Sequence, residues 1–141
     1  MRFTAILLLI VLLTLIADNS TSAQPIVDIP KIAGADKPEV EKFLGQATSC
    51  ETIKYGLKCY FIVGETEIVF IDGKADWITI NQMQTTPYSP QALTALGLKN
   101  QIPTFSSDDV IRWEDIQGIR EISITPAGKK IFYVYIKVKT K

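Results

Sequence analysis

Beyond residue 23, most of the large aliphatic side chains of this chain are β-branched, and this constrains its fold more than any other feature. Residues 24–141 contain 17 Ile and 7 Val against only 5 Leu. Ile and Val pack well on a pleated strand, whereas a helix restricts their side-chain rotation. We therefore expect a protein dominated by β-sheet, in which helices play a minor part.

The first 23 residues have the pattern of a secretory signal peptide. Arg2 supplies the positive start, residues 5–16 are an apolar run, and Thr21-Ser22-Ala23 places small residues before the predicted cut. A run this short does not span a bilayer comfortably; the alternative is an uncleaved N-terminal anchor. We expect a secreted or periplasmic protein cut after Ala23. Its mature part, residues 24–141, would be one domain that meets a membrane only through the leader before cleavage.

Charge and composition exclude several classes of function. Lys and Arg together number 15, as do Asp and Glu, so the formal net charge is zero, and the chain has no His. Nucleic-acid binding needs a surplus of Lys and Arg, so no nucleic-acid partner is expected. His is the commonest general base and metal ligand. The sequence also lacks zinc-ligand, phosphate-loop and nucleophile-elbow motifs. We expect a protein that is not an enzyme and has no cofactor or metal.

The two cysteines, Cys50 and Cys59, are predicted to form a disulfide. An exported protein folds in an oxidising compartment, where paired cysteines are normally bonded. The residues between them read as a hairpin with its turn near Tyr55 and Gly56. The alternative is a reactive thiol, but the chain has no Cys-x-x-Cys pair and no His to activate one.

Two short helices of similar sequence precede two similar groups of strands. Residues 37–45 and 89–97 both contain Pro-x5-Leu-Gly. Strand-like segments follow at 57–63, 65–71 and 75–81, and again at 110–116, 119–125 and 130–139. The expected fold class is α+β, with short helices packed on one face of an antiparallel sheet of about six strands. A tandem α-β-β-β repeat over residues 33–81 and 88–139 is predicted; a chance likeness between two ordinary helices is the alternative.

The first helix and its surroundings resemble a known family. Residues 32–48 contain a Gly, a capped helix with Val40, and then Leu44-Gly45, and they resemble the opening of SmpA/OmlA outer-membrane lipoproteins. Residues 67–78 are similar to the Phe-x-Asp-Gly-Lys hairpin of such modules. The resemblance implies helices on an antiparallel sheet, as in the β-lactamase-inhibitor-protein fold, which has two tandem copies. Gln46 stands where Pro is usual, and the lipoprotein Cys is missing.

Aromatic residues on the strands are the candidate binding site. Residues 131–139 alternate, so Phe132, Val134, Ile136 and Val138 are predicted to face the core. Tyr133 and Tyr135 then share the opposite face with Trp77, and Tyr55 lies in the predicted hairpin turn. Tyr and Trp are enriched at protein interfaces, so we expect a module that binds another envelope or secreted protein. The alternative is that these are ordinary half-exposed strand residues.

Three other functions stay open at this point. An inhibitor of a secreted enzyme would have a protruding loop, such as residues 54–57 or 64–65. A small hydrolase or carbohydrate-binding protein would bring together its loop carboxylates. A carrier of small apolar ligands would need a cavity between helices and sheet. The candidate carboxylates are Asp108, Asp109, Glu114 and Asp115.

Overall fold

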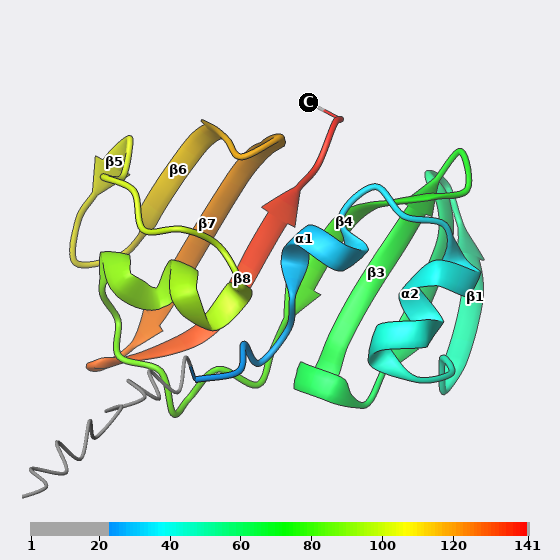
Figure 1. Cartoon of the computed structure of the whole chain (residues 1–141), viewed down its shortest axis with the longest axis horizontal. Helices are drawn as coiled ribbons and strands as arrows, with labels where there is room; N and C mark the ends of the chain where they lie inside the picture. Colours follow the sequence, from blue (N-terminus) through cyan, green and yellow to red (C-terminus); the bar gives the residue numbers. More distant parts are fainter. Residues whose placement is uncertain (1–22, 141) are drawn as a thin grey trace, which may run out of the picture.

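The computed structural model describes residues 23–140, which form an α+β fold around a single antiparallel sheet (Figure 1). The short helices are α1 (Ile29–Ile32) and α2 (Lys37–Leu44), and the 3₁₀ turns are η1 (Val63–Glu65) and η2 (Pro90–Leu96). The strands are β1 (Ser49–Ile53), β2 (Gly56–Phe61), β3 (Thr66–Ile71), β4 (Lys74–Ile80), β5 (Phe105–Ser106), β6 (Ile111–Ile116), β7 (Ile119–Ala127) and β8 (Lys130–Lys137).

The sheet consists of two meanders joined at its centre. Its strand order is β1-β2-β3-β4-β8-β7-β6-β5. The two meanders meet where β4 pairs with β8, with Ile78 opposite Ile136 and Ile80 opposite Val134. A strand from the middle of the described chain, β4, therefore lies beside the last described strand, β8, at the centre of the sheet.

The sheet has eight strands, so the expected number of about six is wrong. The two extra strands lie at the two edges. The sequence of β1 is Ser-Cys-Glu-Thr-Ile, and its side chains are mostly exposed. The strand β5 has only two residues. Neither segment has the apolar alternation that predicts a strand, because an edge strand with little buried surface does not require it.

The helices cover one face of the sheet (Figure 1). Asp36 caps α2 by accepting a hydrogen bond from the backbone N–H of Glu39, as its sequence predicts. Val40 and Leu44 of this helix join one continuous core with the strands. The second predicted helix is also present, but η2 is a 3₁₀ helix.

The prediction for one strand residue is wrong: Phe132 is 54% exposed, and Ile131 is fully buried. The register between β7 and β8 shifts, because Thr125 pairs with Tyr133 but Pro126 pairs with Ile131. Phe132 is thus the extra residue of a β-bulge, which breaks the strict alternation of the strand. Beyond the bulge Val134, Ile136 and Val138 are buried as predicted.

Candidate functional site

The candidate site is the sheet face opposite the helices, here called the open face. Trp77 lies on β4, whereas Tyr133 and Tyr135 lie on the neighbouring strand β8, and all three side chains are partly exposed. Trp77 pairs with Lys137, and Tyr135 pairs with Thr79, so Trp77 and Tyr135 are diagonal neighbours across the β4–β8 ladder. The structure therefore brings the three predicted residues together on one face.

Tyr55 joins this group from the hairpin between β1 and β2. Its ring centroid lies 4.9 Å from that of Trp77, and the two rings are tilted by 53°. Tyr55 remains 52% exposed. The hairpin tip therefore lies against the open face and extends the aromatic surface toward the sheet edge. We call Tyr55, Trp77, Tyr133 and Tyr135 the aromatic row.

Asp76 fixes the position of Trp77, and sequence reasoning missed it. One carboxylate oxygen of this buried residue accepts hydrogen bonds from the backbone N–H groups of Lys139 and Thr140, at 3.1 and 3.2 Å. The Thr140 hydroxyl in turn accepts a hydrogen bond from the indole N–H of Trp77. A lone Asp beside Trp in a mainly apolar strand was the available signal, since a buried carboxylate needs hydrogen-bond donors.

Paired charges flank the aromatic row on the same face. Lys58 lies 2.8 Å from Glu67 and 4.9 Å from the ring centroid of Tyr60. Hydrogen bonds with Glu67 and then with Tyr60 raise the pKa of the Lys58 ammonium group above its ordinary value. On the other side of the row, the Arg112 Nε atom lies 3.7 Å from Glu121. Most of the charge on this face is thus locally balanced.

Tyr135 belongs to both the aromatic row and this charged surrounding. Burial raises the pKa of its phenol first, and the negative charges of Glu121 and Asp76 raise it further. The Lys137 ammonium group also lies over the Tyr135 ring, with its Nζ atom 5.8 Å from the ring centroid. Tyr135 is therefore a partly exposed neutral phenol that can donate a hydrogen bond to a partner.

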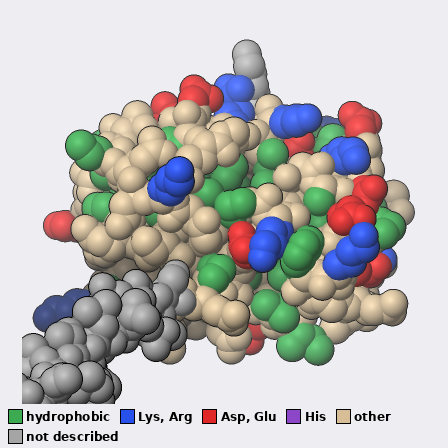
Figure 2. All heavy atoms as spheres, in the orientation of Figure 1, with side chains coloured by type: hydrophobic (Ala, Val, Ile, Leu, Met, Phe, Trp, Pro, Cys, Tyr) green, Lys and Arg blue, Asp and Glu red, His purple; other side chains and the backbone are tan. Residues whose placement is uncertain are grey.

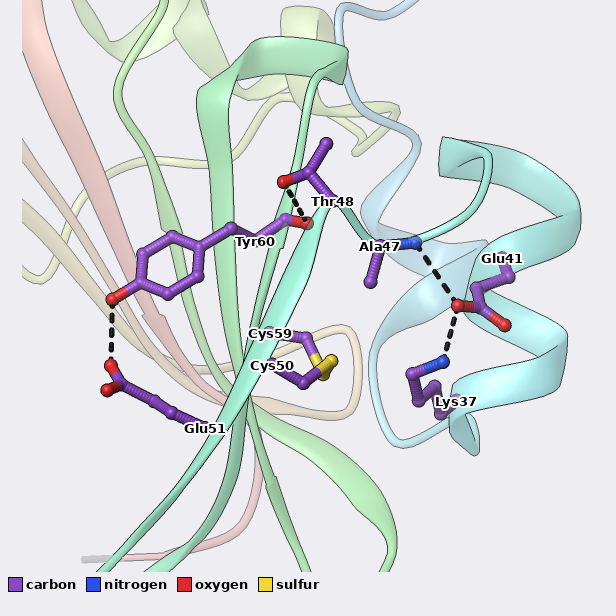
Figure 3. The surroundings of a disulfide bond; sticks show 8 residues. All are labelled: Lys37, Glu41, Ala47, Thr48, Cys50, Glu51, Cys59 and Tyr60. Carbon is purple, nitrogen blue, oxygen red and sulfur yellow. Dashed lines mark hydrogen bonds and ion pairs between the residues drawn. A yellow bond between two sulfur atoms is a disulfide. The ribbon is translucent and has the colours of Figure 1, made fainter.

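The Cys50–Cys59 disulfide holds the hairpin that carries Tyr55. Cys50 lies directly opposite Cys59 with 4.1 Å between their Cα atoms, which confirms the predicted pairing. Figure 3 shows the disulfide on the side of the strands nearest α2, whereas Tyr60 and Glu51 project from the other side. The Tyr60 hydroxyl donates to Glu51 at 3.0 Å. A disulfide indicates an oxidising environment, either extracellular or periplasmic.

The four candidate carboxylates do not converge. Asp108 and Asp109 lie in the turn between β5 and β6, where their charges, after burial, raise the pKa of Tyr88. Glu114 and Asp115 lie toward the opposite end of β6, beside a hollow of about 180 Å³ that Arg120 and Glu121 also line. Within residues 23–140, no three His, Cys, Asp or Glu side chains are grouped so that they could hold a metal ion.

Of the two loops named for an inhibitor, residues 54–57 carry the exposed Tyr55, and at residues 64–65 Glu65 is exposed but Gly64 is buried. Gly64 is buried in η1, and a Cβ atom there would lie 2.9 Å from a Val27 methyl group. The space between helices and sheet is filled by large buried side chains, among them Ile29, Leu93 and Trp113. This packing gives no support to the carrier interpretation.

Fold and site together define a class: a small α+β protein with helices on one face of its sheet and an aromatic row on the other. In comparisons with family models, curated proteins and solved structures, the chain matches none. In the described part of the chain, every helix is too short or too polar to cross a membrane. The predicted leader falls almost entirely on residues 1–22, which lie outside the described part.

Proposed function

We propose that this protein is a non-catalytic module of the periplasm or the extracellular space that binds another exported protein through its open face. The observation that carries the proposal is the aromatic row, in which four rings from two strands and a hairpin turn lie on one face of the sheet. Tyr and Trp offer large contact areas with polar ends at a low entropic cost, which suits them to protein interfaces.

The flanking ion pairs support the same function. The Lys58–Glu67 pair lies on one side of the row, and the Arg112–Glu121 pair lies on the other. An aromatic centre with a charged rim is the usual composition of a protein interface. The rim charges would orient a partner. The rings of the aromatic row, once the partner covers them, would supply most of the affinity.

A duplicated unit of one helix and several strands would explain the layout of the sheet. The helix α2 precedes the meander β1–β4, and η2 precedes the meander β5–β8. This arrangement is in keeping with the resemblance to SmpA/OmlA domains and to the β-lactamase-inhibitor-protein fold. Under this proposal the aromatic row lies where the two units join, because β4 and β8 are their last strands.

The test is affinity capture from the exported proteins of the source organism. The bait is the protein expressed with its own leader and purified, compared with the triple variant Trp77→Ser, Tyr133→Ser and Tyr135→Ser. We expect a specific partner to bind the unchanged protein and to be lost with the triple variant. Near-UV circular dichroism checks that the triple variant is folded.

A matched control removes exposed apolar groups from the helix-bearing side. Phe43→Ser and Val63→Ser change two residues that line one hollow beside α1. This double variant should retain the partner. Capture that survives the triple variant, or that both variants abolish equally, would refute the open face as the binding surface.

A further inference from the structure

The strand order of the sheet is symmetric about its centre. From the centre outward, β4 and β8 come first, then β3 and β7, and then β2 and β6. A two-fold axis in front of the open face, parallel to the central strands, would therefore set each of these strands against its counterpart in the other meander of a second copy. In such a contact β4 lies against β8 of the second copy, and β2 lies against its β6.

The pairing register determines which side chains would meet across this axis. One row of directly paired residues crosses the open face from β2 to β6 and consists of Lys58, Val69, Trp77, Lys137, Glu121 and Glu114. The axis turns this row end for end. Lys58 then lies opposite Glu114 of the second copy, and Trp77 lies opposite Lys137 of the second copy. Each contact occurs twice, because a two-fold interface is self-complementary.

Glu114 needs a positive charge that the single chain does not supply. Its side chain is exposed, and within residues 23–140 no Lys or Arg lies within ion-pair distance of its carboxylate. Its direct neighbour across the β6–β7 ladder is Glu121, and like charges directly opposite each other are destabilising. Lys58 of a second copy would offset this repulsion.

The next row across the open face is also complementary to itself. It consists of Tyr60, Glu67, Thr79, Tyr135, Ser123 and Arg112. The same axis sets Arg112 opposite Tyr60 of the second copy, and a guanidinium group attracts an aromatic ring. In neither row does the axis oppose two like charges. The open face therefore fits a second copy of itself.

The helix-bearing side lacks this match. Figure 2 shows many charged side chains around α2 on that side, and few around η2. An axis of the same kind there would set the charged groups near α2 against the surface near η2, where they would lose water without gaining a partner. Charge complementarity therefore selects the open face for contact between copies.

The open face is large enough for a weak dimer but not for a permanent one. Six strands at a spacing of about 4.8 Å, each about 20 Å long, cover a flat area of roughly 500 Å². Stable interfaces bury about 800 Å² of accessible surface on each partner, and permanent dimers bury more. Stacked sheets also cross at about 30°, so the outer strands diverge, and only long side chains such as Lys58 and Glu114 can follow.

We propose that two copies of this chain associate through their open faces in a reversible two-fold dimer, with Lys58 of each copy paired with Glu114 of the other. The dimer covers the aromatic row of both copies. This goes beyond the proposed function, because it gives the open face an occupant when no other exported protein is bound. Such a protein then has to displace the second copy.

Sedimentation equilibrium of the purified protein from about 1 μM to about 500 μM tests the proposal, since dimerisation depends on concentration. We expect a monomer–dimer equilibrium with a dissociation constant of about 10–100 μM. Lys58→Glu and Glu114→Lys, each alone, should weaken the dimer by roughly tenfold or more, because each variant opposes like charges in both symmetric contacts. Near-UV circular dichroism checks that both variants are folded.

Mixing the two variants gives the decisive result. An equimolar mixture should form a mixed dimer with a dissociation constant within about threefold of that of the unchanged protein. In the mixed dimer one contact has both charges reversed and the other has both charges unchanged, so opposite charges meet in each. A variant that merely failed to fold would not regain association in this way.

The matched control is Lys42→Glu, which reverses an exposed charge of α2 on the helix-bearing side and should dimerise normally. The proposal fails if the unchanged protein stays monomeric up to about 500 μM. It also fails if the mixture associates no better than either variant alone, or if Lys42→Glu weakens the dimer as much as they do. None of these results alters the capture of another exported protein, so failure of the dimer is distinguishable from failure of the proposed function.

Discussion

At the scale of single residues, the β-bulge on β8 gives Ile131 and Phe132, which are adjacent and apolar, very different contributions to the stability of the fold. Ile131 is fully buried in the core, whereas Phe132 is more than half exposed. We expect Ile131→Ala to lower the free energy of unfolding by about 2–5 kcal/mol, because it removes buried contacts and leaves a cavity. Phe132→Ala should cost less than about 1 kcal/mol.

Urea unfolding of both variants checks this prediction. A larger loss for Phe132→Ala than for Ile131→Ala would mean that the strand alternates without a bulge, and equal losses would mean that both residues contribute equally to the core. The larger side chain would have the smaller effect only because it lies outside the core, so the order of the two losses is the decisive observation.

Because of Tyr135, the free energy of unfolding should decrease at alkaline pH. Its pKa is raised in the folded protein, so the folded state keeps the phenol proton where an unfolded Tyr, with a pKa of about 10, loses it. The stability from this group is complete below about pH 10 and is lost as the pH rises through the higher native pKa.

Tyr135→Phe should therefore lose less stability than the unchanged protein between about pH 9 and pH 11. In a pH titration followed by absorbance at 295 nm, Tyr135→Phe should lack one phenolate transition that the unchanged protein shows with its midpoint above pH 10. A variant with the same alkaline loss as the unchanged protein would show that Tyr135 titrates as in the unfolded chain.

At the scale of elements, the hairpin of β1 and β2 depends on its disulfide. The strand β1 buries almost nothing and pairs only with β2 in the described fold. Replacing the cysteines, as Cys50→Ser with Cys59→Ala, should lower the free energy of unfolding by about 2–3 kcal/mol in the chain-entropy model.

Amide hydrogen exchange locates this effect. In the double variant we expect faster exchange in β1 than in β3, because β3 keeps both neighbouring strands. Reduction of the unchanged protein with dithiothreitol should reproduce the result. Uniform acceleration over the whole sheet would mean that the disulfide supports the global fold and not the hairpin.

The sequence predicts the elements that carry buried apolar patterns and misses those that do not. The α2 helix, the cysteine hairpin and the central strands follow from capping, turn and alternation signals in the residues themselves. The edge strand β5 has no such signal, β1 is indicated only by the cysteine hairpin and not by apolar alternation, and the bulge at Phe132 depends on how β7 and β8 pair. Trp77, Tyr133 and Tyr135 were predictable because alternation assigns faces. The Asp76 contacts with Lys139 and Thr140 span more than 60 residues and arise only in the fold.

At the scale of the whole molecule, one core connects the two meanders, so they should unfold together. The buried cluster includes Ile68 of the first meander and Trp113 of the second. The chain has two Trp residues, Trp77 in β4 and Trp113 in β6, so each reports on one meander.

We expect Trp77→Phe and Trp113→Phe each to show one denaturation transition, with fluorescence and far-UV circular dichroism coinciding within each variant. The midpoints of the two variants will differ, because Trp113 is fully buried and Trp77 is not. Separate transitions by the two probes would show that the meanders unfold independently.

The pairing of β4 with β8 also determines when the sheet can close. Trp77 pairs with Lys137, which is 60 positions later in the chain. Each meander is built from neighbouring strands, whose short connections are fast to close, whereas the central ladder must bring together distant segments at a greater entropic cost. During synthesis, the edge of β4 that pairs with β8 stays unpaired until residues 130–137 have been made. The last strand to appear is therefore the one that converts two half-sheets into a single folded protein.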